Sequence, residues 1–84
     1  MDQSLGPRAV SVHPLENYLL QVEFNNGETR LFDVSPYLEK GVFSKLKNIS
    51  FFMKAHQEYG TVVWDETLDI APETLYEKSI PATN

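Results

Sequence analysis

Apolar and polar residues alternate in one stretch of the chain, which predicts the element around which the rest is arranged. Leu20, Val22 and Phe24 are separated by polar residues, as is typical of a strand with one apolar face. Asn26-Gly27 follows, and then a second β-prone run. Asn and Gly both tolerate the positive φ that a type I′ turn needs at its two central residues. The stretch therefore predicts a β-hairpin.

A first strand is expected just before this hairpin. Val10 and Val12 alternate with smaller or polar residues, so both valines are predicted to lie on one face. Pro14 ends the strand, because proline cannot donate a hydrogen bond to a sheet ladder. The three runs predict an antiparallel meander with strands at 9–13, 18–24 and 28–34.

Short helical pieces are expected in the middle of the chain. Ser35 is a suitable helix cap and Pro36 a suitable first helical residue, and Gly41 ends this turn. Asp33 is expected to accept bonds from backbone N–H groups here rather than to bind a metal or act in catalysis. Apolar residues three apart predict two further helical pieces, at Phe43/Leu46 and Phe52/Ala55. The cluster Phe51-Phe52-Met53 is interpreted as core.

A second hairpin and a last helix are predicted in the C-terminal third. Residues 56–59 and 61–65 are β-prone and Gly60 lies between them, with Trp64 expected to be buried. Pro72 begins the helix, and Asp69 is expected to accept bonds from its free N–H groups.

The fold class that follows is α+β. We expect a small antiparallel sheet of about five strands, made of the three-stranded N-terminal meander and the C-terminal hairpin, with short helices, one near the C-terminus. The 84 residues predict a single domain, 1–84, with an ordered core at about 8–78 and frayed termini.

The amino-acid composition excludes several classes of protein. Without Cys the chain has no disulfide, thiolate or iron–sulfur chemistry, and His13 and His56 lack the spacing of metal ligands. His13, at a strand end, is interpreted as a surface residue rather than a catalytic base. No apolar run approaches the length of a membrane helix, and the N-terminal residues lack the features of a signal peptide. A cytoplasmic location without membrane contact is the expectation.

Charge is unevenly distributed in a chain of net charge −5. Four lysines fall within residues 40–54, and six acids lie within residues 58–77. The acids are either a solvated face or a surface that orients a charged partner. The second interpretation predicts a partner-binding set, which comprises Asp65, Glu66, Glu73 and Glu77. Direct nucleic-acid binding is not expected, because it needs a positive field.

Motifs for chemistry are absent from the sequence. There is no P-loop, dinucleotide-binding glycine motif, nucleophile elbow or zinc-protease motif. Asp65-Glu66 and Asp69 form a carboxylate cluster that is compatible with a divalent metal or an acid–base pair, but acids beside a helix start more commonly cap it. We predict no catalytic, cofactor-binding or metal-binding residues, no cofactor and no enzymatic activity.

The order of these motifs resembles the small bacterial family called domain of unknown function 2442. The similarity spans about residues 8–77, and its most specific part is Trp64 with the run 69–76. It implies a small α+β fold and no established catalytic residues; Asp65 after Trp64 adds a charge of unassigned role. Larger members carry a C-terminal helix-turn-helix domain, which this chain is expected to lack. The resemblance also implies a frequent genomic neighbour, domain of unknown function 4160, and a role as antitoxin in a toxin–antitoxin pair.

Three hypotheses of function follow. The first is a non-enzymatic protein-binding domain that acts as the antitoxin-like partner of a small, basic toxin. The second is a regulatory module associated with a DNA-binding partner. The third is an enzyme or a small-ligand binder of unknown specificity. The sequence leaves the oligomeric state open.

Overall fold

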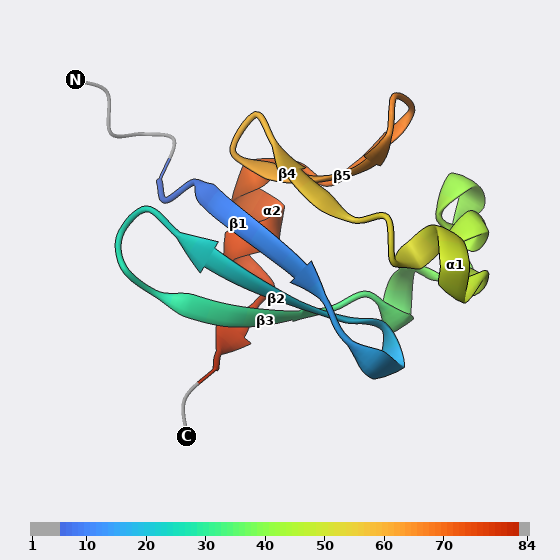
Figure 1. The fold of residues 1–84 in the computed structure, drawn as a ribbon, viewed down its shortest axis with the longest axis horizontal. Coiled ribbons are helices and arrows are strands. Elements are labelled where there is room, and N and C mark those ends of the chain that lie inside the picture. The colour runs from blue at the N-terminus through green and yellow to red at the C-terminus, as the bar shows by residue number, and fades with distance from the viewer. Residues whose placement is uncertain (1–5, 83–84) are drawn as a thin grey trace.

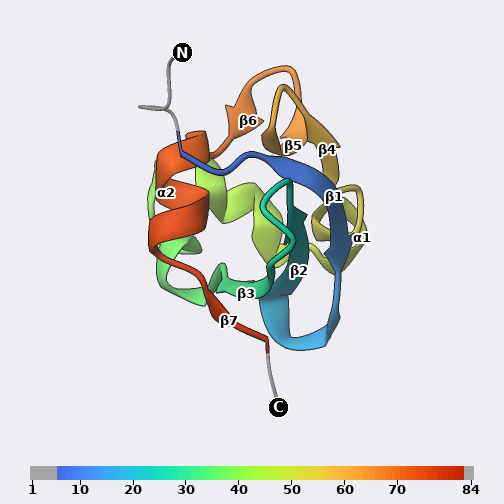
Figure 2. The ribbon, with the colours of Figure 1, turned by 90° about the vertical axis from the view of Figure 1, so that its left-hand side faces the viewer.

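The N-terminal meander forms as the alternation predicts. A computed structural model describes residues 6–82, and the leader expected at residues 1–7 lies mostly outside them. Three antiparallel strands and a short fourth one form a sheet of order β1-β2-β3-β7, in which β7 lies beside β3 (Figure 1, Figure 2). Their bounds are β1 Ala9–Pro14, β2 Leu19–Phe24, β3 Thr29–Asp33 and β7 Ile80–Pro81.

The C-terminal hairpin belongs to a second sheet of order β4-β5-β6. Residues 6–82 therefore form two small sheets rather than one sheet of about five strands. β1 lies beside β4, and the Ala9 N–H donates to the Gly60 carbonyl where they meet (Figure 1). A bulge near Ala9 and the missing N–H of Pro14 deprive β1 of a regular ladder toward β4. The new strands are β4 His56–Glu58, β5 Thr61–Asp65 and β6 Leu68–Asp69.

Short helices connect and cover the sheets. The α-helix α2 lies behind β1 and β2 in Figure 1, and α1 lies at the far end of the molecule from the N-terminus. None of the helices that the structure describes is long and apolar enough to cross a membrane. The α-helices are α1 Ile49–Phe52 and α2 Pro72–Glu77, and the 3₁₀ helices are Glu16–Tyr18, Ser35–Tyr37 and Gly41–Lys47.

One hydrophobic core joins the two sheets and the helices. Leu20, Val22 and Phe24 are 0–3% exposed, which confirms the apolar face of β2. Trp64 is 3% exposed, as predicted, and its indole N–H donates to the Phe52 carbonyl at 3.0 Å. The other members of the core are Ala9, Val12, Phe32, Val34, Leu46, Phe52, Ala55, Val62, Leu68, Ile70 and Leu75.

The first strand differs from its predicted pattern. Val10 is 55% exposed while Val12 is buried, so the two valines do not share a face. The register shifts between Ala9 and Ser11, which is a β-bulge. The extra residue reverses the alternation and turns Ala9, instead of Val10, into the core.

The first hairpin turn has a positive φ at Gly27, as expected, but it is not of type I′. Gly27 has φ 92°, whereas Asn26 has no positive φ. The Gly27 N–H donates to the Phe24 carbonyl, and the Phe24 N–H donates to the Glu28 carbonyl. This three-residue loop, with its left-handed glycine, forms a bulged hairpin, the next most common solution after the two-residue turns.

Several helix caps also differ from the predictions. Ser35 makes no side-chain cap, but its N–H donates to Asp33 Oδ1 at 2.9 Å, so the role expected of Asp33 is confirmed. Asn48 caps α1 by accepting from two backbone N–H groups. α2 begins at Pro72 as predicted, yet no side chain caps it, and Asp69 lies in β6 instead.

Two further interpretations need correction. Within Phe51-Phe52-Met53 only Phe52 is core, since Phe51 is half-buried and Met53 is 49% exposed. A one-turn helix can bury only one side. The tail was expected to be loose after residue 78, but Ile80 pairs with Leu31 in β7. Arg30 holds this segment by donating to the Ser79 hydroxyl and carbonyl.

Candidate functional site

The outer face of the second sheet carries a row of side chains from three strands. Val62 and Trp64 point into the core, so strand alternation places Val63 between them on the opposite face. His56 of β4 and Asp69 of β6 both pair with Val63 in the register. A histidine and a carboxylate therefore flank a valine across the sheet.

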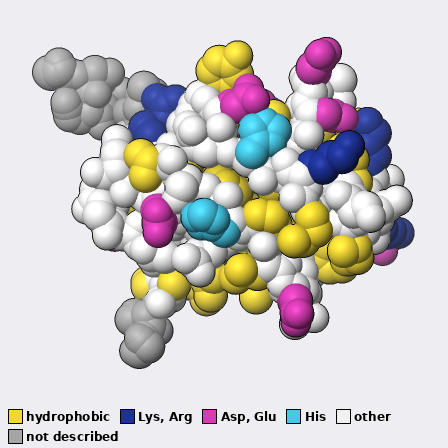
Figure 3. Space-filling view, viewed as in Figure 1, with side chains coloured by type: hydrophobic (Ala, Val, Ile, Leu, Met, Phe, Trp, Pro, Cys, Tyr) yellow, Lys and Arg dark blue, Asp and Glu magenta, His cyan; other side chains and the backbone are white. Residues whose placement is uncertain are grey.

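Four carboxylates, one of them Asp69 of this row, gather on this face. Together with Tyr59 they line a shallow cavity of about 440 Å³, which we call the acidic depression. Figure 3 shows acidic side chains beside a histidine along the upper part of the face. The lining residues are His56, Glu58, Tyr59, Val63, Asp65, Glu66 and Asp69.

His56 is held between two acceptors. Its Nδ1 lies 2.9 Å from the Lys54 carbonyl oxygen, and its Nε2 lies 2.8 Å from a carboxylate oxygen of Glu58. A ring with acceptors at both nitrogens favours the doubly protonated imidazolium. The pKa of His56 is raised above its ordinary value, mainly by the hydrogen bond to the Lys54 carbonyl and secondly by the Glu58 carboxylate.

Asp65 is fixed at the other end of the acidic depression. Its Oδ1 accepts bonds from the backbone N–H and the hydroxyl of Thr67, both at 2.9 Å. These bonds, with the Lys45 ammonium 3.7 Å away, lower the pKa of Asp65. Asp65 is therefore a carboxylate at neutral pH, and it shapes the β5–β6 turn as well as carrying charge.

Tyr59 projects from the β4–β5 turn at the rim of the acidic depression. Its side chain is 82% exposed and its backbone is left-handed, with φ 56°. Gly60 follows with φ 78°, so these two residues form a two-residue turn with positive φ at both central positions. Arg8 supports the turn by donating to the Tyr59 carbonyl at 2.7 Å. The backbone that carries this exposed tyrosine is thus held by Arg8.

The structure separates the predicted partner-binding residues. Asp65 and Glu66 line the acidic depression. Glu73 and Glu77 are exposed on α2, whose Leu75 packs into the core against the inner side of the sheet. The prediction missed His56, Glu58 and Tyr59. The alternation of β4 against β5 carries the signal for the first two, once the turn is placed at 59–60.

The chemistry available here is the binding of cations that belong to a larger partner. In residues 6–82 there is no group of three or more His, Asp and Glu arranged to hold a metal ion. Carboxylates that surround an apolar floor, with one exposed aromatic ring at the rim, suit Lys and Arg side chains of a protein surface.

Comparison with known proteins adds the family. The family model described as protein of unknown function, DUF2442, matches residues 9–81. The chain belongs to this family. The match covers both sheets and confirms the resemblance found in the sequence. No curated protein and no solved structure matches the chain. As a DUF2442 protein, the chain inherits no assigned activity.

Proposed function

We propose that this protein is a non-enzymatic, cytoplasmic protein-binding domain, the antitoxin-like partner of a small basic toxin. The acidic depression carries the proposal. It combines four carboxylates, one exposed tyrosine and an apolar floor on a single face. Interfaces are enriched in tyrosine, and a patch of net negative charge steers a positively charged partner.

The strained turn supports the same conclusion. Asn or Gly would fit position 59 better, because a left-handed conformation costs an ordinary L-residue roughly 1–2 kcal/mol. A large, exposed aromatic side chain in this conformation contributes nothing to the core. Strained residues cluster at binding sites, where their position matters more than their cost. Tyr59 is therefore the proposed anchor of the interface.

The resemblance to the DUF2442 family supplies the class of partner. It implies a toxin encoded beside the antitoxin gene, and a basic toxin matches the sign of the acidic depression. The first experiment expresses the adjacent small open reading frame alone and together with this protein. The proposal expects growth arrest that co-expression relieves, and a complex that co-purifies. If the adjacent reading frame is not toxic and no complex forms, the antitoxin proposal is rejected.

A charge-matched pair of variants then locates the interface. Glu66→Lys with Asp69→Lys changes the acidic depression, and Glu73→Lys with Glu77→Lys makes the same charge change on α2. All four side chains are exposed. We expect the first pair to slow association at least about tenfold at low salt, and the second pair to have a smaller effect. Equal slowing would show steering by net charge alone and would reject the acidic depression as the docking site.

A further inference from the structure

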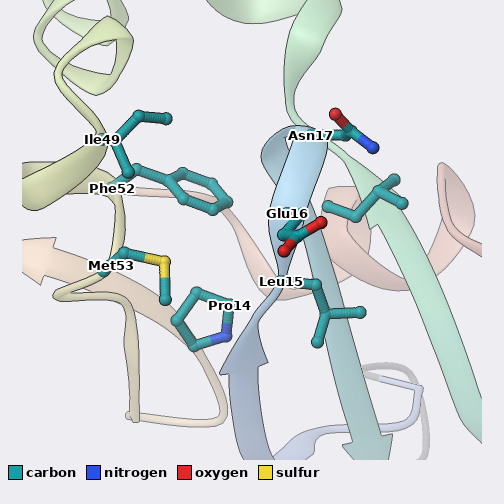
Figure 4. Close-up of a pocket in the computed structure, with 8 residues that line it drawn as sticks. Pro14, Leu15, Glu16, Asn17, Ile49, Phe52 and Met53 are labelled. Carbon is teal, nitrogen blue, oxygen red and sulfur yellow. The ribbon is translucent and has the colours of Figure 1, made fainter.

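A second hollow lies where the two sheets separate, outside the acidic depression. The loop between β1 and β2 forms one wall, and α1 with the following residue forms the other (Figure 4). We call this hollow, of about 930 Å³, the apolar groove. Its walls are mostly apolar, and they consist of Pro14, Leu15, Glu16, Asn17, Leu19, Ile49, Phe52 and Met53.

Three of the apolar side chains in these walls are exposed to solvent. Ile49 is 53% exposed, Met53 is 49% exposed and Leu15 is 36% exposed. Burying Leu, Ile or Met gains about 1.5–3 kcal/mol each when the whole side chain leaves water. Methionine also adapts its shape to different contacts. In Figure 3, hydrophobic side chains form a continuous patch at the centre and right of the face. A patch of this kind typically marks an interface.

The walls of the apolar groove are held in place before anything binds. The Tyr18 hydroxyl donates to the Lys47 carbonyl at 2.6 Å, and the Tyr18 ring packs edge-on against Phe52 at 5.2 Å. Asn17 and Tyr18 are both left-handed, with φ 64° and 61°. Two consecutive strained residues tied to the α1 region give a loop with little freedom to collapse into the groove.

The charges beside the apolar groove complement each other. Glu16 lies on the loop wall. Lys54 follows Met53 in the sequence; it is exposed beside the α1 wall rather than part of it, and its ammonium lies 5.8 Å from the centroid of the Phe51 ring. A surface with an anion on one side of an apolar centre and a cation on the other is self-complementary under a two-fold rotation. The rotation places each Glu16 opposite the Lys54 of the other copy, with the apolar side chains between them.

From this arrangement we infer that the apolar groove binds a second copy of this chain in a symmetric dimer. Met53 and Ile49 of each copy enter the groove of the other, and Glu16–Lys54 pairs close the rim. The dimer uses none of the residues that line the acidic depression, so it is independent of the proposed toxin binding. Because the groove is short, the association is weak and depends on protein concentration.

Sedimentation equilibrium tests the dimer directly. We expect the wild-type protein to pass from monomer to dimer between about 1 μM and about 1 mM, the range of weak association. Ile49→Glu with Met53→Glu is expected to stay monomeric throughout. Val42→Glu is the control for an acid placed at an exposed apolar residue elsewhere, since Val42 is 56% exposed and does not line the groove. Circular dichroism checks that each variant remains folded.

Charge exchange tests the two-fold arrangement itself. Glu16→Lys alone and Lys54→Glu alone each place like charges opposite one another and are expected to weaken dimerisation about tenfold or more. The double variant restores opposite charges and is expected to recover wild-type dimerisation. Recovery would not occur if the two residues did not meet across the axis, so its absence would overturn the arrangement.

Two other results would also overturn the inference. One is a wild-type protein that is monomeric at every concentration. The other is a dimer that Val42→Glu disrupts as strongly as the groove variant does. A monomer whose groove variant loses the toxin complex would assign the apolar groove to the toxin instead.

Discussion

The β2–β3 and β4–β5 hairpins of this protein both reverse the chain in a short turn, but with different residues at the left-handed positions. In the β2–β3 hairpin, Asn26-Gly27 places glycine at the left-handed position, and a Cβ at Gly27 would meet nothing within 4 Å. In the β4–β5 hairpin, Tyr59 takes a left-handed position and Gly60 lies against the Arg8 guanidinium. The first turn uses residues suited to its backbone. The second uses a residue that its backbone disfavours.

The difference separates folding from function. Local backbone preference explains the left-handed glycine of the first turn, and Arg8 contacts this turn through its backbone only: the Arg8 N–H donates to Asn25 Oδ1, and the Asn25 N–H donates to the Arg8 carbonyl. The second turn displays an aromatic ring beside four carboxylates, and the Arg8 side chain supports it by donating to the Tyr59 carbonyl. Strain of this kind persists only where the surrounding structure over-determines it. The stability of the β4–β5 hairpin is therefore expected to depend strongly on the residues that hold it, Trp64 and Arg8.

Of these two residues, Trp64 is expected to contribute more to stability. It is 3% exposed, and its indole N–H donates to the Phe52 carbonyl. Trp64→Ala leaves a cavity and an unpaired carbonyl, so we expect a loss of about 3–5 kcal/mol in the free energy of unfolding. Urea denaturation measures it. Native fluorescence that is strongly red-shifted and easily quenched would contradict the burial on which this prediction depends.

The glycines of the two turns should differ in their tolerance of a side chain. A Cβ at Gly60 would lie 2.9 Å from Arg8 Cζ and displace the guanidinium that holds Tyr59. Gly60→Ala is expected to cost about 1–3 kcal/mol. Gly27→Ala, which adds only backbone strain, is expected to cost about 1 kcal/mol, and Gly27→Val somewhat more because it is β-branched.

Urea midpoints measured side by side provide this test. An unchanged midpoint for Gly27→Val would contradict the left-handed turn. Equal costs for the two alanine variants would show that Arg8 adjusts freely, and would remove the argument that it supports the second turn.

Replacing Tyr59 should change stability and binding in opposite directions. Asn tolerates the left-handed conformation, so Tyr59→Asn is expected to stabilise the fold by up to about 1 kcal/mol. The same change removes the proposed anchor and is expected to accelerate dissociation of the toxin complex. Thermal melts and dissociation rates measure the two effects. A variant that is both more stable and equally tight in binding would show that Tyr59 has no role in recognition.

The sequence predicted what depends on local patterns and missed what depends on how distant segments meet. Alternation identified the apolar face of β2, and Gly27 marked its turn. The predicted alternation of β1 was wrong near Ala9, because no local signal in the sequence shows the extra residue of the bulge. The division into two sheets depends on the edge of β1 against β4, and the acidic depression depends on the register of three strands. The prediction that Asp69 caps α2 was wrong because the pairing of β6 with β5, which places Asp69 in a strand, is not visible in the local sequence.

His56 offers the subtlest test of the β4–β5 hairpin, through pH. Its pKa is raised above the ordinary value of 6.5 by the Lys54 carbonyl and by Glu58. A raised pKa means that the folded state binds the proton more tightly than the unfolded state does. The stabilisation is therefore fully present below pH 6.5 and is lost as pH rises through the higher, folded-state pKa. The effect is small, because both side chains are nearly half exposed to solvent.

Urea midpoints measured from about pH 5.5 to about pH 8.5 should show this decline in the wild-type protein. His56→Gln removes the titrating group and should flatten the profile across this range. Glu58→Gln should keep a reduced slope, since the Lys54 carbonyl still accepts from Nδ1. His13→Gln is the control for the second histidine, which is exposed in β1 and has no part in the hairpin. A profile that His13→Gln flattens and His56→Gln does not would assign the pH dependence to the meander and leave the β4–β5 hairpin without a charged anchor.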